Sequence, residues 1–232
     1  TVQRNSGTGL YQQHIPGLDS GRGYLLAAVR QKGGVRRQPH EGGDGALRLF
    51  HVPALHELPQ RHQRQHHGGG FVVEIMHMTV NIVGFTEIQE AIRDNCPEEF
   101  FTLVMRRFMM KIAERIARDH GCGCLVTGEN LGQVASQTME AMAVTGACVD
   151  LPIFQPLIGM DKEEIVTRAR QIGTMETSIL PYEDCCTVFT PRHPKTKPTL
   201  AQVDAACAPL DMEGLIARAL ENTELVKVRW HG

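Results

Sequence analysis

Two adjacent cysteines are the first residues of this sequence that could do unusual chemistry. They end the stretch PYEDCC, residues 181–186, and directly follow two carboxylates. Negative neighbours are expected to raise the pKa of a thiol and so to reduce its reactivity at rest. A disulfide between the neighbours is disfavoured, because consecutive Cα atoms lie about 3.8 Å apart and an unstrained bridge needs roughly 4.4 to 6.8 Å. At least one thiol, Cys185 or Cys186, is therefore predicted to have a role other than a structural bridge.

A glycine-containing stretch, TGENLGQVASQT, is a second candidate site. Gly128 ends a predicted strand and permits close approach of a ligand to the backbone. Gly132 is predicted to open a helix whose free amides could receive an anion or a purine edge. Neutral side chains that follow, Gln137 among them, add donors and acceptors without charge. An ordinary glycine turn before a polar helix face explains the stretch equally well, so both interpretations stay open.

Three basic side chains stand where positive charge is unfavourable. Lys162 is predicted in the first turn of a helix, where a cation opposes the helix dipole unless an anion such as phosphate lies there. Alternatively, it is a solvated lysine that pairs with Glu163 or Glu164. Arg106 and Arg107 lie in the apolar stretch FFTLVMRRFMMKIA, so one of them must leave the core or find an acceptor. Alternatively, both lay their stems along apolar surface and keep their heads in water.

The cysteines do not form a convincing zinc site. CGC at 122–124 and CC at 185–186 lack the gap of two to four residues that is typical of structural zinc ligands. Cys124 is instead predicted to face the core as part of a strand. The isolated thiols are predicted to be small buried hydrophobes, namely Cys96, Cys148 and Cys207.

Length and composition restrict the class of protein. The 232 residues suffice for one sizeable core, and the net charge of -2 gives no global attraction to nucleic acid or anionic lipid. Any RNA contact must therefore be local or supplied from elsewhere. No run approaches the roughly 18 apolar residues of a membrane span, and the polar start lacks a signal-peptide pattern. With 7 cysteines and no export signal, we expect a cytoplasmic protein without membrane contact.

The elements that must position these residues alternate between strand and helix. Strands are predicted over residues 24–29, 71–83 and 122–128, an extended segment over 149–157, and helices over 97–120, 132–144 and 161–173. This order predicts an α/β fold with a mostly parallel, twisted sheet and helices on both faces. Ligands of such sheets bind outside the carboxyl ends of the strands. TGENLGQVASQT, PLIGMDKEE and PYEDCC all occupy such positions, which favours one shared site.

The segment from Phe85 to Leu200 resembles a known family nearly continuously. The motifs LVTGENLGQVASQT, PLIGMDKEE, PYEDCC and PRHPKTKPTL occur in the order that the family has them. The segment is similar to the PP-loop ATP-pyrophosphatase domain of the ThiI family, the tRNA 4-thiouridine synthetases or tRNA sulfurtransferases. The resemblance covers about half of the chain and implies a fold like that of the adenine nucleotide alpha hydrolases.

The resemblance implies an adenylating sulfur transferase. Such enzymes bind ATP and Mg²⁺, adenylate the C4 oxygen of a tRNA uridine with loss of pyrophosphate, and replace that oxygen with sulfur from a persulfide carrier such as a cysteine desulfurase. They also supply sulfur for the thiazole of thiamine. The expected partners are tRNA, bound through domains absent from this chain, the persulfide donor, and a second copy in a homodimer.

Five residues match functional positions of the family. Gly128, Gln137 and Arg106 match nucleotide-binding positions. Lys162 matches a lysine needed for activity, and Cys186 matches the thiol that takes part in sulfur transfer. A thiol that resolves a persulfide works without the very low pKa of a primary nucleophile. The resemblance therefore implies a role for Cys186 that is compatible with the two carboxylates before it.

The pyrophosphate loop departs from the family. The family carries SGGxDS directly after its first strand, and its aspartate helps to organise magnesium. Here IPGLDS keeps Gly17, Asp19 and Ser20, but it precedes the predicted strand 24–29. Pro16 stands where a glycine is expected and removes one amide of the phosphate cradle.

The N-terminal part of the chain has a different composition from the rest. Residues 36–70 contain no Lys, Ile, Ser or Thr, while His, Arg, Gln, Gly and Pro crowd together. The resemblance to the family implies that Phe50, in LFHVP, matches an aromatic residue of an adenine-binding stretch similar to HFHSPP, although LFHVP shares little of that stretch. We expect residues 1–84 to be the poorly matching N-terminal part of the PP-loop domain and residues 85–232 to be its remainder. The break favours a disturbed reading frame over a degenerate, weakly active homologue.

Two other functions stay open at this point. One is a PP-loop ligase that acts on a small molecule, which tRNA-independent pyrophosphate release would reveal. The other is a nucleotide-binding or sulfur-carrying module without adenylation activity, which would bind ATP and form no pyrophosphate even with tRNA present.

Overall fold

An initial run of strands is followed along the chain by helices with single strands between them. The structure is a computed structural model and describes residues 23–27, 46–52, 63–65, 71–73, 77–179 and 191–229. Its strands are β1 (Gly23–Ala27), β2 (Ala46–Val52), β3 (Gln63–Gln65), β4 (Phe71–Val73), β5 (His77–Gly84), β6 (Cys122–Thr127), β7 (Ile153–Phe154) and β8 (Glu224–Arg229). Its helices are α1 (Thr86–Asn95), the 3-10 turn η3 (Glu98–Phe100), α2 (Phe101–Asp119), α3 (Met139–Gly146), α4 (Lys162–Gln171), α5 (Met175–Ser178), α6 (Leu200–Cys207) and α7 (Met212–Glu221).

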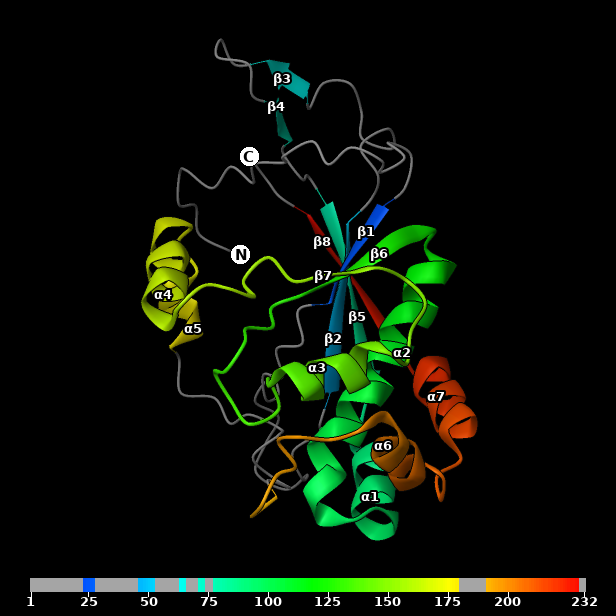
Figure 1. Cartoon of the computed structure of the whole chain (residues 1–232). Coiled ribbons are helices and arrows are strands. Elements are labelled where there is room, and N and C mark those ends of the chain that lie inside the picture. Colours follow the sequence, from blue (N-terminus) through cyan, green and yellow to red (C-terminus); the bar gives the residue numbers. More distant parts are fainter. Residues whose placement is uncertain are drawn as a thin grey trace, which may run out of the picture.

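Six of these strands form one sheet in the order β7-β6-β1-β2-β5-β8, and β3 pairs with β4 separately. β7, β6 and β1 run parallel, whereas the pairings of β1 with β2, β2 with β5 and β5 with β8 are antiparallel. The α/β class predicted from the sequence is confirmed, with the parallel strands gathered at one side of a mixed sheet. The helices α1 and α2 carry the chain from β5 to β6, which runs in the same direction (Figure 1).

The long helix α2 lies at the centre of the core. Its buried face follows the spacing of an amphipathic helix, with Phe101, Val104, Met105, Phe108, Ile112 and Ile116 among its members. In Figure 1, α2 and α7 lie on one side of the sheet, and α4 and α5 lie on the other. Among the described residues, no helix has the length and apolar content needed to cross a membrane.

Helix ends agree with the sequence signals. Asp161 caps α4 and forms a capping box with Glu164, in which each side chain receives the other residue's backbone N–H. Gly121 follows the end of α2 with a φ of 66°, and Gly173 follows α4 with a φ of 70°. These two glycines adopt a backbone conformation that other residues rarely take, which agrees with the ends of the helices predicted over 97–120 and 161–173.

Three predicted elements differ from the structure. The single strand predicted over 71–83 is wrong, because β4 and β5 belong to different sheets. The helix predicted over 132–144 begins only at Met139, because Thr138 is its cap and accepts a hydrogen bond from the N–H of Ala141. Within the extended segment predicted over 149–157, only β7 is a strand. In the last two cases, a pattern that is continuous in the sequence is interrupted by residues that are neither helix nor strand.

Candidate functional site

The carboxyl ends of β6 and β7 lie side by side. The two strands are parallel, with Leu125 opposite Ile153 and Val126 opposite Phe154. Residues 128–138 form the loop after β6, and residues 155–161 form the loop after β7. Two of the three stretches that the sequence predicted to share a site, TGENLGQVASQT and PLIGMDKEE, therefore meet at one edge of the sheet, where α/β proteins bind ligands.

A buried carboxylate connects these two strands to α2. Glu129 forms an ion pair with Arg106 of α2. Its Oε2 accepts a hydrogen bond of 2.8 Å from the Thr127 hydroxyl and one of 2.7 Å from Nε2 of Gln155. We call these four residues the Glu129 network. Because its donors come from α2, β6 and the segment after β7, the network fixes these three elements relative to one another at the site.

Arg106 is held by this network instead of projecting into water. Its side chain is 18% exposed and that of Glu129 is 11% exposed. Burial lowers the pKa of Arg106 to about 10, so the guanidinium stays protonated at neutral pH. Its Nε is buried and makes no hydrogen bond within the described part of the chain. The alternative in which the head of Arg106 lies in water is therefore wrong, and any anion that binds Arg106 must share it with Glu129.

Asn130 fastens the two loops to each other. Its Nδ2 donates a 2.6 Å hydrogen bond to the carbonyl of Leu157 and a second one to the carbonyl of Met160. The N–H of Leu131 donates to the carbonyl of Ile158 at 3.2 Å. The Oδ1 of Asn130 is buried and has no hydrogen-bond partner among the described residues. The orientation of this amide is fixed, because a flipped amide would direct its oxygen at two carbonyl oxygens.

The glycine stretch forms a turn instead of a helix start. Gly132 has a φ of 79°, and its N–H donates to the carbonyl of Gln137 at 2.8 Å. The prediction that Gly132 opens a helix with free amides is therefore wrong, since this amide is already paired. Gly128 is exposed, and a Cβ built on it would have no atom within 4 Å. The backbone at Gly128 thus faces open space, as close approach of a ligand requires.

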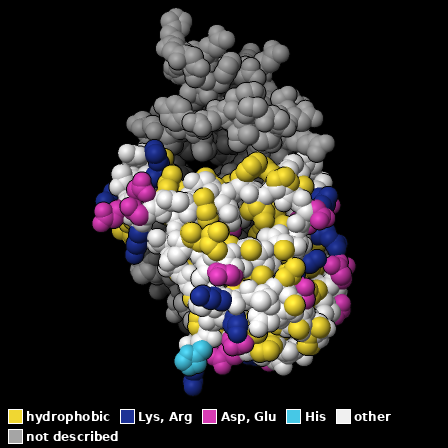
Figure 2. Space-filling model, viewed as in Figure 1, with side chains coloured by type: hydrophobic (Ala, Val, Ile, Leu, Met, Phe, Trp, Pro, Cys, Tyr) yellow, Lys and Arg dark blue, Asp and Glu magenta, His cyan; other side chains and the backbone are white. Residues whose placement is uncertain are grey.

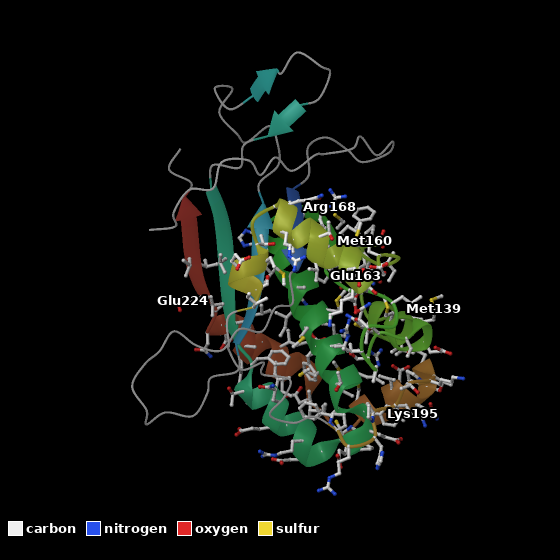
Figure 3. The ribbon with its side chains drawn as sticks, turned by 90° about the vertical axis from the view of Figure 1, so that its left-hand side faces the viewer. Met139, Met160, Glu163, Arg168, Lys195 and Glu224 are labelled. Atoms are coloured by element: carbon white, nitrogen blue, oxygen red, sulfur yellow. The ribbon has the colours of Figure 1, made fainter. Side chains whose placement is uncertain are left out.

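Lys162 is the first residue of α4 and is exposed. None of the ion pairs among the described residues involves it, so its predicted pairing with Glu163 or Glu164 is not found there. Glu164 is instead engaged in the capping box with Asp161. Figure 3 shows Glu163 and Met160 close to this end of α4. Lys162 therefore has a positive charge without a partner in this part of the structure.

Apolar side chains are exposed on the loops of the site. Leu131 and Val134 are 42% and 56% exposed, Met139 at the start of α3 is 69% exposed, and Ile158 is 37% exposed. Figure 2 shows hydrophobic side chains on the face that these elements share. Apolar surface beside a polar network is what a pocket for a flat, partly polar ligand needs.

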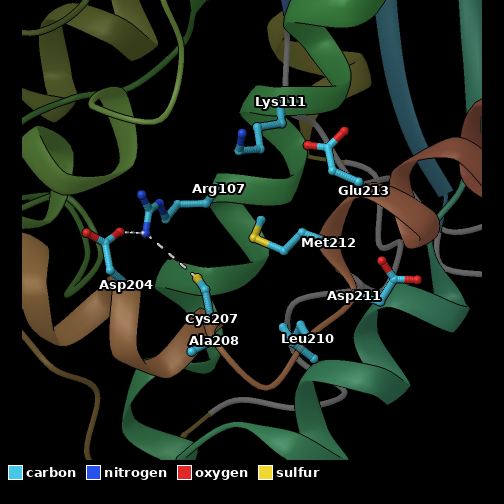
Figure 4. Close-up of a pocket in the computed structure, with 9 residues that line it drawn as sticks. All are labelled: Arg107, Lys111, Asp204, Cys207, Ala208, Leu210, Asp211, Met212 and Glu213. Carbon is cyan, nitrogen blue, oxygen red and sulfur yellow. Dashed lines mark hydrogen bonds and ion pairs between the residues drawn. The ribbon is translucent and has the colours of Figure 1, made fainter.

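The residue that follows Arg106 serves a different part of the fold. Arg107 donates to Oδ1 of Asp204 at 2.6 Å and lies 3.8 Å from Sγ of Cys207, both on α6. These residues line a pocket of about 450 Å³ together with Lys111 and the start of α7 (Figure 4). Cys207 and Cys124 are buried as predicted, whereas Cys96 and Cys148 are half-buried.

Sequence reasoning missed three members of the site. Glu129, Asn130 and Gln155 are polar residues directly after buried strands, and this position was the available signal. Glu129 and Asn130 are 8% and 3% exposed. Their burial distinguishes them from ordinary loop residues, and it depends on packing that the local sequence does not show.

Several predicted site residues are not placed by the structure. Asp19, Gly17, Ser20 and Cys186 lie outside the described residues. Phe50 lies on β2, opposite Leu26 of β1 and Val80 of β5. Among the described residues, no group of three or more His, Cys, Asp or Glu side chains could hold a metal ion.

Known proteins share this sequence and fold. A family model described as "Thiamine biosynthesis protein (ThiI)" matches residues 71–212. The "Probable tRNA sulfurtransferase" of Acetivibrio thermocellus is 56% identical over 151 residues, which cover 65% of this chain and 38% of that protein. The "Probable tRNA sulfurtransferase" of Moorella thermoacetica is 42% identical over 241 residues, which cover 97% of this chain and 60% of that protein. A solved 4-thiouridine synthetase in complex with RNA and bound ATP matches with a TM-score of 0.62 and 35% identity, over 65% of this chain and 39% of that one.

The fold defines an α/β protein of the PP-loop class, and the candidate site lies at the carboxyl ends of its parallel strands. More particularly, the chain belongs to the ThiI family, because the family model matches more than half of it. The chain spans only 38% to 60% of the length of the two relatives described above.

Proposed function

We propose that this chain provides the ATP-dependent activation step of a tRNA sulfurtransferase that makes 4-thiouridine. The observation that carries this proposal is the likeness to a 4-thiouridine synthetase bound to RNA and ATP, at 35% identity and a TM-score of 0.62. The polar, partly apolar site at the ends of β6 and β7 supports it, since this is where such folds bind nucleotides.

The reaction has two chemical steps. The C4 oxygen of a tRNA uridine attacks the α-phosphorus of ATP, and pyrophosphate leaves. A sulfur nucleophile then forms a bond to C4, and AMP leaves with the original oxygen. Cys186 releases this sulfur by attacking the persulfide of a donor, such as a cysteine desulfurase, which leaves a disulfide that a thiol reductant must reopen. The same sulfur supply serves the thiazole of thiamine.

ATP occupies the loops after β6 and β7. Gly128 lets the nucleotide approach the backbone, because the space around this glycine is open. Gln137, partly buried in the turn before α3, contacts the nucleotide through its amide. Arg106 contacts the phosphates while Glu129 holds it. Lys162 neutralises negative charge that develops on the phosphates during adenylation, because it stands exposed and unpaired among the described residues.

The N-terminal part of the chain completes the nucleotide site. Gly17, Asp19 and Ser20 form the pyrophosphate loop, and Asp19 would help to hold the Mg²⁺ that accompanies ATP, where the ion would neutralise phosphate charge. Phe50 stacks on adenine. Residues 1–84 and 85–232 together form one PP-loop domain, which is supported by the pairing of β2 and β5 with the rest of the sheet. The Moorella match, which covers 97% of the chain, also supports it. Resequencing the coding DNA across residues 1–80 tests the disturbed-frame hypothesis, which a restored SGGxDS motif would support.

The proposed setting is the cytoplasm, where tRNA and a persulfide donor are both present, and the active form is a homodimer. Because relatives are longer than this chain, tRNA is also held by domains outside it.

The test measures adenylation and thiolation separately in the longest form of the protein that its gene encodes. Pyrophosphate release from ATP should depend on tRNA, and 4-thiouridine should appear when a persulfide donor is added. Cys186→Ser should keep adenylation and lose thiolation, while the matched control Cys185→Ser should keep both. Pyrophosphate release that does not need tRNA would refute the proposed substrate. Full thiolation by Cys186→Ser would refute the role of that cysteine.

A further inference from the structure

A short basic segment precedes α6. Residues 191–199 read PRHPKTKPT and contain Arg192, His193, Lys195 and Lys197. Arg192, His193 and Lys197 are exposed, and Lys195 is half-buried. The segment approaches α6 in Figure 1, and in the same view Figure 2 shows Lys, Arg and His side chains at the bottom of the molecule, with Asp and Glu side chains between them. The net charge of the whole chain, -2, gives no hint of this local surface.

Backbone contacts hold the basic segment in place although it contains no strand and no helix. The N–H of Arg192 donates to Oε1 of Glu98 at 2.9 Å, and the N–H of Lys195 donates to the carbonyl of Glu99 at 3.0 Å. Pro191 is buried at one end of the segment. At its other end Thr199 begins α6 through a capping box with Gln202. The backbone of the segment is thus fixed before any partner arrives, so little ordering entropy would be lost on binding.

Most of the positive charge in the segment is not compensated. None of the ion pairs among the described residues involves Arg192 or Lys197. Lys195 makes only a long contact of 4.0 Å with Glu99 and lies 5.9 Å from the centre of the Phe100 ring. Two exposed cations on a fixed backbone are therefore available to a polyanion.

The segment is joined directly to the candidate site. The Thr138 hydroxyl donates to the carbonyl of Thr196 at 2.6 Å, and Thr138 is also the cap of α3. Thr138 ends the loop that contains Gly128 and Gln137. Figure 3 shows Lys195 and Met139, the first residue of α3, on the same flank of the molecule. A phosphate chain on the basic segment would therefore lie next to the loop that faces the nucleotide.

We propose that residues 191–199 form a contact surface for the phosphate backbone of the RNA substrate, beside the adenylation site. The inference rests on the proposed function and adds a contact made by this chain itself, in addition to domains outside it. Arg192 and Lys197 carry the contact through charge, so it positions the RNA without reading its sequence. The segment presents no Phe, Tyr or Trp ring and no large aliphatic side chain, which favours phosphates over a protein surface as its partner.

The test compares two double variants that change charge equally. Arg192→Gln with Lys197→Gln removes the exposed cations of the segment. Arg115→Gln with Arg118→Gln removes two cations near the end of α2, the first about 21 Å along that helix from its first residue, Phe101. The affinity of the 232-residue chain for a tRNA transcript is measured between about 0.05 and 0.2 M salt, where phosphate contacts have their strongest effect on binding. ATP affinity of each variant is measured separately.

We expect the first variant to lose about 5- to 8-fold in RNA affinity per lost phosphate contact at about 0.1 M salt. The slope of log affinity against log salt should fall by about 0.7 to 0.9 per contact, while the control keeps the wild-type slope. Equal slopes in both variants, or no RNA binding by the wild-type chain at low salt, would overturn the proposal. So would loss of binding to the persulfide donor protein with RNA affinity unchanged. Wild-type RNA binding without pyrophosphate release would refute the proposed function and leave this contact standing.

Discussion

Replacing Glu129 with glutamine tests the ion pair at the centre of the site. Glutamine keeps the shape of the side chain, and its carbonyl oxygen can still accept from Thr127 and Gln155. The amide nitrogen then faces the guanidinium of Arg106, so two donors oppose each other. The substitution therefore removes the counter-ion of a buried cation without opening a cavity.

The loss of stability can be estimated from the geometry. Removing one partner of a buried ion pair costs about 3 to 5 kcal/mol of unfolding free energy. The side chains of Arg106 and Glu129 are 18% and 11% exposed, so some water reaches them. We therefore expect about 3 kcal/mol, at the lower end of that range. For a chain of this size, this loss lowers Tm by roughly 6 to 12 °C.

The matched control is Glu213→Gln, which removes the partner of Arg115 from a pair whose side chains are 63% and 52% exposed. This loss should stay below about 1 kcal/mol. Urea unfolding followed by circular dichroism measures both variants. In a double-mutant cycle with Arg106→Gln, the double variant should be more stable than the sum of the single losses predicts, by about 2 kcal/mol. Equal losses for Glu129→Gln and Glu213→Gln, or additive effects in the cycle, would refute a buried pair.

Four further predictions concern single residues. Gly128→Val should fold normally, because a Cβ there meets no atom within 4 Å, and calorimetry should show ATP binding weakened about tenfold or more; unchanged affinity would place the nucleotide elsewhere. Lys162→Ala should lower the rate of pyrophosphate release by about 100-fold and ATP affinity far less, whereas equal losses would indicate ground-state binding. Burial raises the pKa of Cys96 from 9.0 to about 11, which lowers its thiolate fraction at pH 8 about 100-fold. Iodoacetamide should therefore alkylate Cys96 about 100-fold more slowly in the folded than in the denatured protein, and peptide mass spectrometry measures both rates. Burial alone would raise the pKa of Glu114, but hydrogen bonds from Arg118 and two backbone amides hold this pKa below its usual 4.5. The ionised carboxylate therefore stabilises the fold above pH 4.5, and this stabilisation should be lost as the pH falls through the lowered pKa. The free energy of unfolding in urea should accordingly depend less on acid pH in Glu114→Gln than in the wild type.

The sequence predicted best those parts of the fold that local rules decide. The start and end of α4 follow from Asp161 and Gly173, whose cap and left-handed backbone need no distant partner. The start of α3 was placed too early, because the apolar and small residues of 132–138 suit a helix as well as a turn. What decides between them is a contact with distant chain, namely the hydrogen bond from Thr138 to Thr196. Turns that depend on such contacts cannot be derived from a local pattern.

The two neighbouring arginines of α2 were likewise predicted only in part. An apolar helix with two adjacent cations predicts that acceptors must exist, and the structure supplies one for each: Glu129 for Arg106 and Asp204 for Arg107. Which acceptors they are depends on how the chain returns to the helix, since Asp204 lies 97 residues further along.

The ion pairs of Arg106 and Arg107 connect the proposed nucleotide site to the proposed RNA surface. Arg106 ties α2 to the ends of β6 and β7, where ATP is proposed to bind. Arg107, one residue further along the same helix, ties α2 to α6. The cap of α6 is Thr199, the last residue of the basic segment. Consecutive residues of one rigid helix therefore fix the proposed RNA surface relative to the proposed nucleotide site. Asp204→Asn, which weakens the second tie, should accordingly disturb RNA-dependent pyrophosphate release more than ATP binding. Equal effects on both would show that α6 does not control the position of the RNA.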